Sequence, residues 1–252
     1  MPNSARNVRT IRTAAAFSSG LYLRVVGFPG DCSFGIAPSS FPRSGASRIS
    51  RAIHYSAPVP ALLELSGAVR MLVLGSAGHG LLARGLLGSV SSAVVRHANC
   101  PVAVVRDEEL PDPHSAPVLL GTDGSPASEL ATEIAFDEAS RRGVDLVAIH
   151  AWSDTAVTEV FEIDWPIVEA EAERHLAESL AGWQERYPDV TVHRLVARDR
   201  AAQHIISSSE TAQLVVVGSH GRGGLARLLL GSVSNAVLHS VRVPVIVARP
   251  PA

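Results

Sequence analysis

The chain has 252 residues, of which 46% are hydrophobic, and this length and apolar content suit two domains of ordinary size. No apolar run approaches the length of a membrane span, which argues against a membrane protein. The two cysteines, Cys32 and Cys100, lack the spacing of metal ligands or of a disulfide framework, and this favours a reducing, cytoplasmic compartment. Cys100 precedes a proline and a predicted strand, so we expect a buried structural thiol there.

Charge is distributed unevenly, and the formal total of −2 conceals a basic N-terminal end. Residues 1–57 carry seven arginines and one acid, Asp31, whereas acids exceed arginines in 58–252. This serine-rich, basic segment has no clear hydrophobic period. A transit peptide and a nucleic-acid-binding arm are alternatives, but basic and aromatic residues do not interleave as nucleic-acid binding would favour. We expect 1–57 to be largely disordered or loosely packed.

Residues 58–106 predict only the last part of an α/β domain. A short helix over 61–68 precedes a strand over 71–74, a glycine loop, a further helix and a final strand over 102–106. Residues 107–116 are rich in Asp, Glu and Pro and predict a linker. The first half therefore has no room for the upstream strands and helices of a complete domain.

Residues 117–252 alternate strands and helices, which predicts a complete α/β domain. The predicted strands cover 117–122, 144–152, 190–197, 213–218 and 243–249, and the predicted helices cover 126–142, 165–186, 201–210 and 232–241. We expect a doubly wound, five-stranded parallel sheet with strand order 3-2-1-4-5 and helices on both faces.

Two of these helices have specific local signals. Ser125 followed by Pro126 is typical of a helix start, and Gly143 is typical of a helix end. In the long helix, apolar or long side chains recur at helical spacing and predict its buried face: Ile167, Ala170, Arg174, Ala177, Leu180 and Trp183.

The two halves share a repeated sequence. Residues 71–106 align with 214–249 without a gap at an offset of 143, and 20 of the 36 aligned residues are identical. Both copies carry Gly-x2-Gly-x9-Gly-Ser after an apolar run, beginning at Gly75 and at Gly218. A strand, a glycine loop and a serine-capped helix together can form an anion site, because backbone N–H groups and the helix N-terminus attract phosphate.

In an open parallel sheet, ligands bind beyond the carboxyl ends of the strands. At those ends Asp123 can bind a ribose or adenine, the backbone near Ala151 can read an adenine edge, and the glycine loop can hold phosphates. Taken singly, Asp123 followed by Gly124 and Ser125 is more typical of a structural turn. The full set of candidate binding residues is Thr122, Asp123, Ala151, Gly218, His220, Gly221, Gly231, Ser232, Val233 and Ser234.

These motifs resemble the universal stress protein family in a tandem arrangement. The resemblance rests on Val-Leu-Leu-Gly-Thr-Asp-Gly-Ser at 118–125 and on 215–234 with its glycine loop, and it covers 58–106 in part and 117–249 fully. It implies ATP binding through Asp123, Ala151, Gly218, Gly221, Gly231 and Ser232. It also implies pairing of last strands, either between 102–106 and 245–249 within the chain or in a homodimer.

Three functions remain open from the sequence. The first is an ATP-binding, non-catalytic regulator of the stress response, with Mg²⁺ as an ion that bound phosphates could recruit. The second is an adenine-nucleotide enzyme with slow ATP hydrolysis or nucleotidyl transfer, although no carboxylate is spaced to orient His150 or His220 as a base. The third is a degenerate interaction module without a ligand. Because the first half lacks the aspartate and its strands, we expect one complete ATP site.

Overall fold

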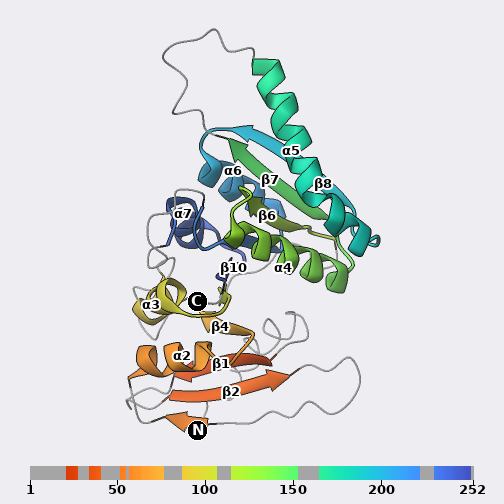
Figure 1. The fold of residues 1–252 in the computed structure, drawn as a ribbon. Helices are drawn as coiled ribbons and strands as arrows, with labels where there is room; N and C mark the ends of the chain where they lie inside the picture. Colours follow the sequence, from red (N-terminus) through yellow and green to blue (C-terminus); the bar gives the residue numbers. More distant parts are fainter. Residues whose placement is uncertain are drawn as a thin grey trace.

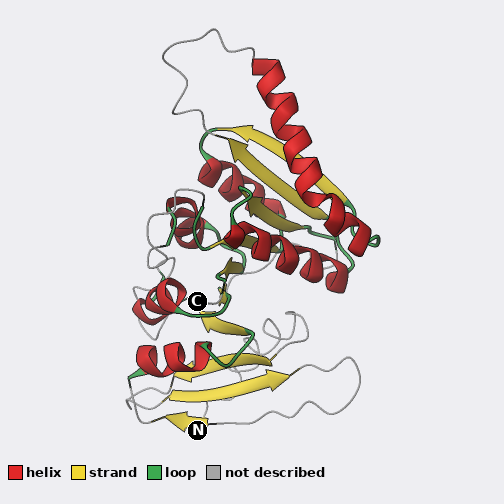
Figure 2. Ribbon diagram, in the orientation of Figure 1, coloured by secondary structure: helices red, strands yellow, loops and turns green. Residues whose placement is uncertain are grey.

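The computed structural model describes residues 21–27, 34–40, 52–54, 57–76, 87–106, 115–152, 165–221 and 230–250. In these residues ten strands form one sheet in the order β3-β2-β1-β4-β5-β10-β9-β6-β7-β8. Figures 1 and 2 show this sheet running through both halves of the chain with helices packed along it. The sheet is mainly parallel, which confirms the predicted α/β class.

The C-terminal half contributes five parallel strands. They are β6 (Val118–Thr122), β7 (Leu146–Trp152), β8 (Val192–Arg198), β9 (Leu214–Gly218) and β10 (Val245–Ala248). In space β7 lies between β8 and β6, and β9 lies between β6 and β10. The four helices are α4 (Pro126–Arg142), α5 (Trp165–Arg186), α6 (Ala201–Ser208) and α7 (Ser232–Ser240), and a 3₁₀ turn η1 (Ser209–Thr211) follows α6.

Apolar side chains cover both faces of the sheet. Buried residues of α4 and α5, among them Phe136 and Leu180, pack on one face. Buried residues of α6 and α7, among them Ile205 and Val237, pack on the other. Central parallel strands are apolar on both faces for this reason. None of the described helices is long and apolar enough to cross a membrane.

Helix α4 begins and ends as its sequence predicts. Ser125 is the N-cap and its hydroxyl accepts a hydrogen bond from the backbone N–H of Ser128, at 3.3 Å. Pro126 takes the first helical position, where its missing N–H costs nothing. Gly143 ends the helix with φ of 65°, a left-handed conformation that glycine adopts without steric cost.

The predicted buried face of α5 is wrong in its first turns. Ile167 is 63% exposed, and Ala170 and Arg174 are exposed as well, whereas Leu176 and Leu180 are buried. Figure 1 shows the reason, because the N-terminal end of α5 extends past the edge of the sheet that it covers. Helical spacing predicts which residues share a face, but burial also requires a partner surface.

The first half contains α2 (Pro58–Ser66), β4 (Met71–Gly75), α3 (Ser89–His97) and β5 (Val102–Val105), as the repeat predicts. Three further strands lie upstream: β1 (Leu21–Gly27), β2 (Phe34–Ser40) and β3 (Ala52–His54). These strands differ from the expectation that 1–57 is loosely packed. β1 pairs with β4, β2 with β1 and β3 with β2, so that the edge that β4 would otherwise expose is covered.

The last strands of the two halves pair with each other, which confirms the predicted intrachain contact. β5 and β10 are antiparallel, and Ala103 lies opposite Ile246. Since 103 and 246 differ by the repeat offset of 143, each half presents the same position to the other. The pairing is therefore an intrachain version of the self-complementary contact that two identical subunits make about a two-fold axis.

Candidate nucleotide site

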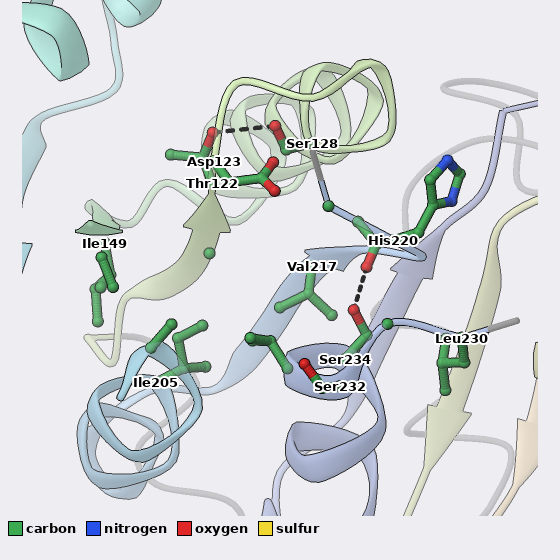
Figure 3. Close-up of a pocket in the computed structure, with 17 residues that line it drawn as sticks. Thr122, Asp123, Ser128, Ile149, Ile205, Val217, His220, Leu230, Ser232 and Ser234 are labelled. Carbon is green, nitrogen blue, oxygen red and sulfur yellow. Dashed lines mark hydrogen bonds between the residues drawn. The ribbon is translucent and has the colours of Figure 1, made fainter. Parts of the chain in front are cut away.

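A cavity of about 460 Å³ opens at the carboxyl ends of β6, β7 and β9 (Figure 3). The structure brings all ten candidate residues predicted from the sequence to its lining. It also adds residues that the sequence did not single out: Gly121, Ser128, Ile149, Ala201, Ile205, Val217 and Leu230. The volume lies within the range of about 300–1,000 Å³ typical of small-molecule pockets.

One wall of the cavity is apolar. Ile149 comes from β7, Ile205 from α6 and Val217 from β9; in Figure 3 Ile149 and Ile205 lie at the left and Val217 lies between them and His220. Gly121 keeps this wall in place, because a Cβ there would meet Ile205 Cδ1 at 2.6 Å and Val217 Cγ1 at 3.2 Å. Such a wall suits a flat, apolar ring face. Ala151, at the end of β7, lies beside this wall in the lining.

The opposite side of the cavity is the start of α7. The helix has Gly231 as its N-cap, without a hydrogen bond from a side chain, so the predicted serine cap is wrong. Glycine has no side-chain acceptor, and the N–H groups of the first turn, at Ser232 and Val233, therefore have no cap within the described residues. An uncapped helix N-terminus that lines a cavity attracts an anion through its N–H groups and the helix dipole.

The two serines of α7 have different roles. Ser234 is buried, and its hydroxyl donates a hydrogen bond to the backbone carbonyl of Gly218. Its proton is thus committed to joining α7 to β9, although Ser234 is among the candidate binding residues. Ser232 is exposed at the first helical position. Its hydroxyl is the one that can turn toward a ligand.

Asp123 lies across the cavity from α7 and contacts the glycine loop. Its Oδ1 accepts a hydrogen bond from the N–H of Ser125 at 3.0 Å, and Gly124 between them has φ of 77°. Its Oδ2 lies only 2.4 Å from where a Cβ of Gly221 would stand. The carboxylate therefore has the structural role that its sequence predicts, because it completes the turn before α4. It also borders the cavity.

The glycines act through close approach. A Cβ on Gly218 would lie 2.9 Å from the backbone of Ala127 and Ser128, so β9 can meet the start of α4 only with glycine there. Gly231 has φ of −61°, and the described glycines with positive φ are Gly124 and Gly143. Neither Gly221 nor Gly231 therefore has the positive φ that would by itself favour glycine at these positions.

Hydroxyls and histidines near the ends of β6, β7 and β9 are engaged with the protein. Thr122 Oγ1 donates to Ser128 Oγ at 3.3 Å (Figure 3). His150 is buried, and its Nδ1 lies 3.0 Å from the carbonyl of Thr122. His220 lines the cavity with its Nδ1 2.9 Å from Ser219 Oγ, and its ring points away from Ile149 and Ile205 in Figure 3.

Metal ligands of protein origin do not cluster in the part of the chain that the structure describes, where no group of three His, Cys, Asp or Glu side chains is close enough to hold an ion. An ion at this site would depend on oxygens supplied by a ligand.

The first half repeats the hydrogen bonds at the two ends of the glycine loop but not the rest of the site. Gly88 N–H donates to Ser76 O, and Ser91 Oγ donates to Gly75 O, as their equivalents Gly231 and Ser234 do in the second half. β1 stands beside β4 as β6 stands beside β9, and Tyr22 and Val118 take equivalent positions.

When this equivalence of Tyr22 and Val118 is extended along the two strands, Gly27 takes the position that Asp123 has in the second half. The neighbouring strand β2 is antiparallel, whereas β7 is parallel to β6. In the described residues the first half therefore lacks both the carboxylate and the strand that supplies Ile149 and Ala151.

The universal stress protein family matches residues 45–106 and 115–249 of this chain. The chain belongs to this family. A universal stress protein of Mycobacterium bovis is 64% identical over 197 residues, which cover 77% of this chain and 67% of that protein. Another, from Mycobacterium tuberculosis, is 55% identical over 209 residues, covering 82% of this chain and 70% of that protein.

Among solved structures, a universal stress protein from Archaeoglobus fulgidus superposes with a TM-score of 0.58 at 24% identity, covering 77% of this chain and 67% of that one. This likeness supports the fold. The family match starts at residue 45, inside the segment that the sequence analysis separated from the family.

Proposed function

We propose that this universal stress protein binds one ATP molecule in the cavity of its C-terminal half and acts as a non-catalytic regulator of the stress response. The observation that carries the proposal is the arrangement around that cavity. An apolar wall, a carboxylate and an uncapped helix N-terminus line one space of about 460 Å³, and these are the groups that a base, a sugar and a phosphate chain require.

Each part of the site has a role in this proposal. Ile149 and Ile205 would pack on the adenine, with the backbone at Ala151 along its edge. Asp123 would accept hydrogen bonds from ribose hydroxyls, since an ionised carboxylate only accepts. The N–H groups of Ser232 and Val233, with the loop at Gly218 and Gly221, would bind the phosphates. Mg²⁺, where present, would neutralise phosphate charge and be held mainly by phosphate oxygens.

We propose a single site per chain. The first half keeps the helix and loop hydrogen bonds, but Gly27 stands in place of Asp123 and β2 runs opposite to β7. We also propose that the intrachain β5–β10 pair takes the place of a homodimer through the last strands, because each of these strands already has its partner. A cytoplasmic location fits the reduced, buried Cys100.

An enzymatic function is the second candidate, as ATP hydrolysis or nucleotidyl transfer. The regulator is favoured because the Nδ1 atoms of His150 and His220 are engaged with Thr122 O and Ser219 Oγ, within the protein itself. A ligand-free interaction module is the third candidate.

The deciding experiment is denaturing extraction of the purified protein with mass analysis of the released nucleotide, followed by calorimetric titration with ATP. Chemically unchanged ATP at one equivalent per chain supports the regulator. Steady production of ADP, abolished with the site variants, supports the enzyme. Folded protein that neither carries nor takes up nucleotide supports the interaction module.

A further inference from the structure

One buried contact connects the first half of the chain to the helix that borders the cavity. Arg106 follows β5 and is only 7% exposed. Its Nη2 donates a hydrogen bond, 2.5 Å long, to the backbone carbonyl of Leu238 in α7. The two residues are 132 positions apart, so this bond forms only when the first half is docked through the β5–β10 pair.

Leu238 lies in the last turn of α7. α7 ends at Ser240, so the carbonyl of Leu238 is among the last four, which have no partner inside the helix. A guanidinium at that end satisfies the carbonyl and also interacts favourably with the negative end of the helix dipole. Arg106 therefore holds the C-terminal end of α7, in a buried setting where a charge-assisted hydrogen bond is strong.

The other end of α7 is the proposed phosphate site. Gly231 N–H donates to Ser219 O at 2.8 Å, and Ser234 is bonded to Gly218 O, so that end is fixed from within the second half. The helix is a single unbroken segment of nine residues. Whatever fixes its C-terminal end also fixes where the N–H groups of Ser232 and Val233 stand relative to the cavity.

The repeat supplies a matched control. Arg249 occupies the position equivalent to Arg106, at the end of β10, and it is 9% exposed. By the offset of 143, the residue equivalent to Leu238 is Val95 of α3. Arg249 is therefore a buried arginine of the same type, at the same seam, whose equivalent helix belongs to the half without a complete site.

We propose that Arg106 is a positioning residue through which the first half controls the affinity of the nucleotide site. The first half then acts as a built-in effector: docking of β5 on β10 places Arg106, Arg106 fixes α7, and α7 presents its N-terminus to the phosphates. This inference rests on the proposed function for its affinity readout. Because coupling free energy is reciprocal, ATP must also stabilise the docking of the first half.

The test compares wild-type protein with Arg106→Met and Arg249→Met, since methionine keeps much of the apolar stem and removes the hydrogen bonds and the charge. Thermal unfolding without nucleotide measures the structural cost of each substitution. Peptide-resolved hydrogen exchange without nucleotide reports on α7 and α3 separately. Calorimetric titration with ATP gives the affinity, and Arg106→Gln, which keeps an N–H donor, is measured beside them.

The expected result is faster exchange in α7 and ATP affinity lowered about fivefold or more for Arg106→Met, within the usual range of coupling between sites. Arg106→Gln should lie between this variant and wild type. Arg249→Met should lower the unfolding temperature but leave α7 exchange and ATP affinity unchanged.

Two results would overturn the inference: unchanged α7 exchange in Arg106→Met, or equal losses of affinity in the two methionine variants. Failure of the wild type to bind ATP would instead overturn the proposed function, and α7 exchange would still decide whether Arg106 positions the helix.

Discussion

Asp123 and Gly221 should act as one unit in ATP binding. The carboxylate Oδ2 lies 2.4 Å from the position of a Cβ on Gly221, far inside contact distance. Gly221→Ala must therefore displace the Asp123 side chain, which is able to rotate. We expect this displacement, rather than any strain at residue 221, to be the main effect, because Gly221 is not among the described glycines with positive φ.

The magnitude follows from the hydrogen bond that Asp123 would make. A hydrogen bond to a charged group contributes about 1.5–3 kcal/mol, so Asp123→Ala should weaken ATP binding about 10- to 150-fold. Gly221→Ala should cost a similar amount if it moves the carboxylate out of place. The double variant should then bind about as weakly as either single variant, because the same interaction is lost only once.

Calorimetric titration of the wild type, both single variants and the double variant gives the coupling energy directly. Asp123→Asn is the control, since its side-chain oxygen can still accept from Ser125 N–H and keep the turn before α4, while the charge is lost. If the loss of binding free energy in the double variant equals the sum of the two single losses within about 0.5 kcal/mol, the reasoning is refuted, since the two residues would then act independently.

Four further predictions concern the two glycine loops, the number of sites, the N-terminal segment and the buried thiol. Gly231→Ala and Gly88→Ala alter N-caps of nearly identical geometry, φ/ψ of −61°/155° and −63°/152°, and should lower thermal stability alike, whereas only Gly231→Ala weakens ATP binding; equal effects on ATP would argue against a single site. Titration of the wild type should saturate at one ATP per chain, and two equivalent sites would contradict this. Deletion of 1–57 should leave ATP affinity unchanged but promote self-association measured by light scattering, because it uncovers the edge of β4; lost affinity would make that segment part of the site. Cys100, whose pKa burial raises to about 12, should resist alkylation at pH 8 until the protein unfolds, and rapid labelling of its peptide in the folded state would disprove its burial.

The elements of the second half were predictable because their signals are local. Ser125, Pro126 and Gly143 each act within a few residues of themselves, and α4 begins and ends where they indicate. The apolar wall was not predictable, because Ile149 and Ile205 have the same residue type as the surrounding core. Both belong to the buried core, and only the packing of α6 against the sheet places them beside the cavity as well.

Most long-range contacts could not be predicted from the sequence either. The β1–β4 pair and the bond from Arg106 to Leu238 join residues with no local pattern in common. The pairing of β5 with β10 is the exception, and it was predictable only through the family resemblance.

The repeated glycine motif has a structural role in both halves, apart from the ligand binding proposed for the second. In both halves it forms the same internal hydrogen bonds, from the helix serine to the strand carbonyl and from the second loop glycine to the serine after the strand. These bonds attach the helix to the sheet with or without a ligand, so they are sufficient reason to find the motif in a half that lacks a site.

The proposed ATP binding adds requirements that the motif does not contain. They are the carboxylate of Asp123, the wall that includes Ile149, and a helix held at both ends. A copy of the glycine motif in a sequence therefore indicates a structural unit and does not by itself indicate a binding site. The first half keeps the hydrogen bonds between helix and strand without the carboxylate or the apolar wall, and it contributes Arg106 to the half that has all three.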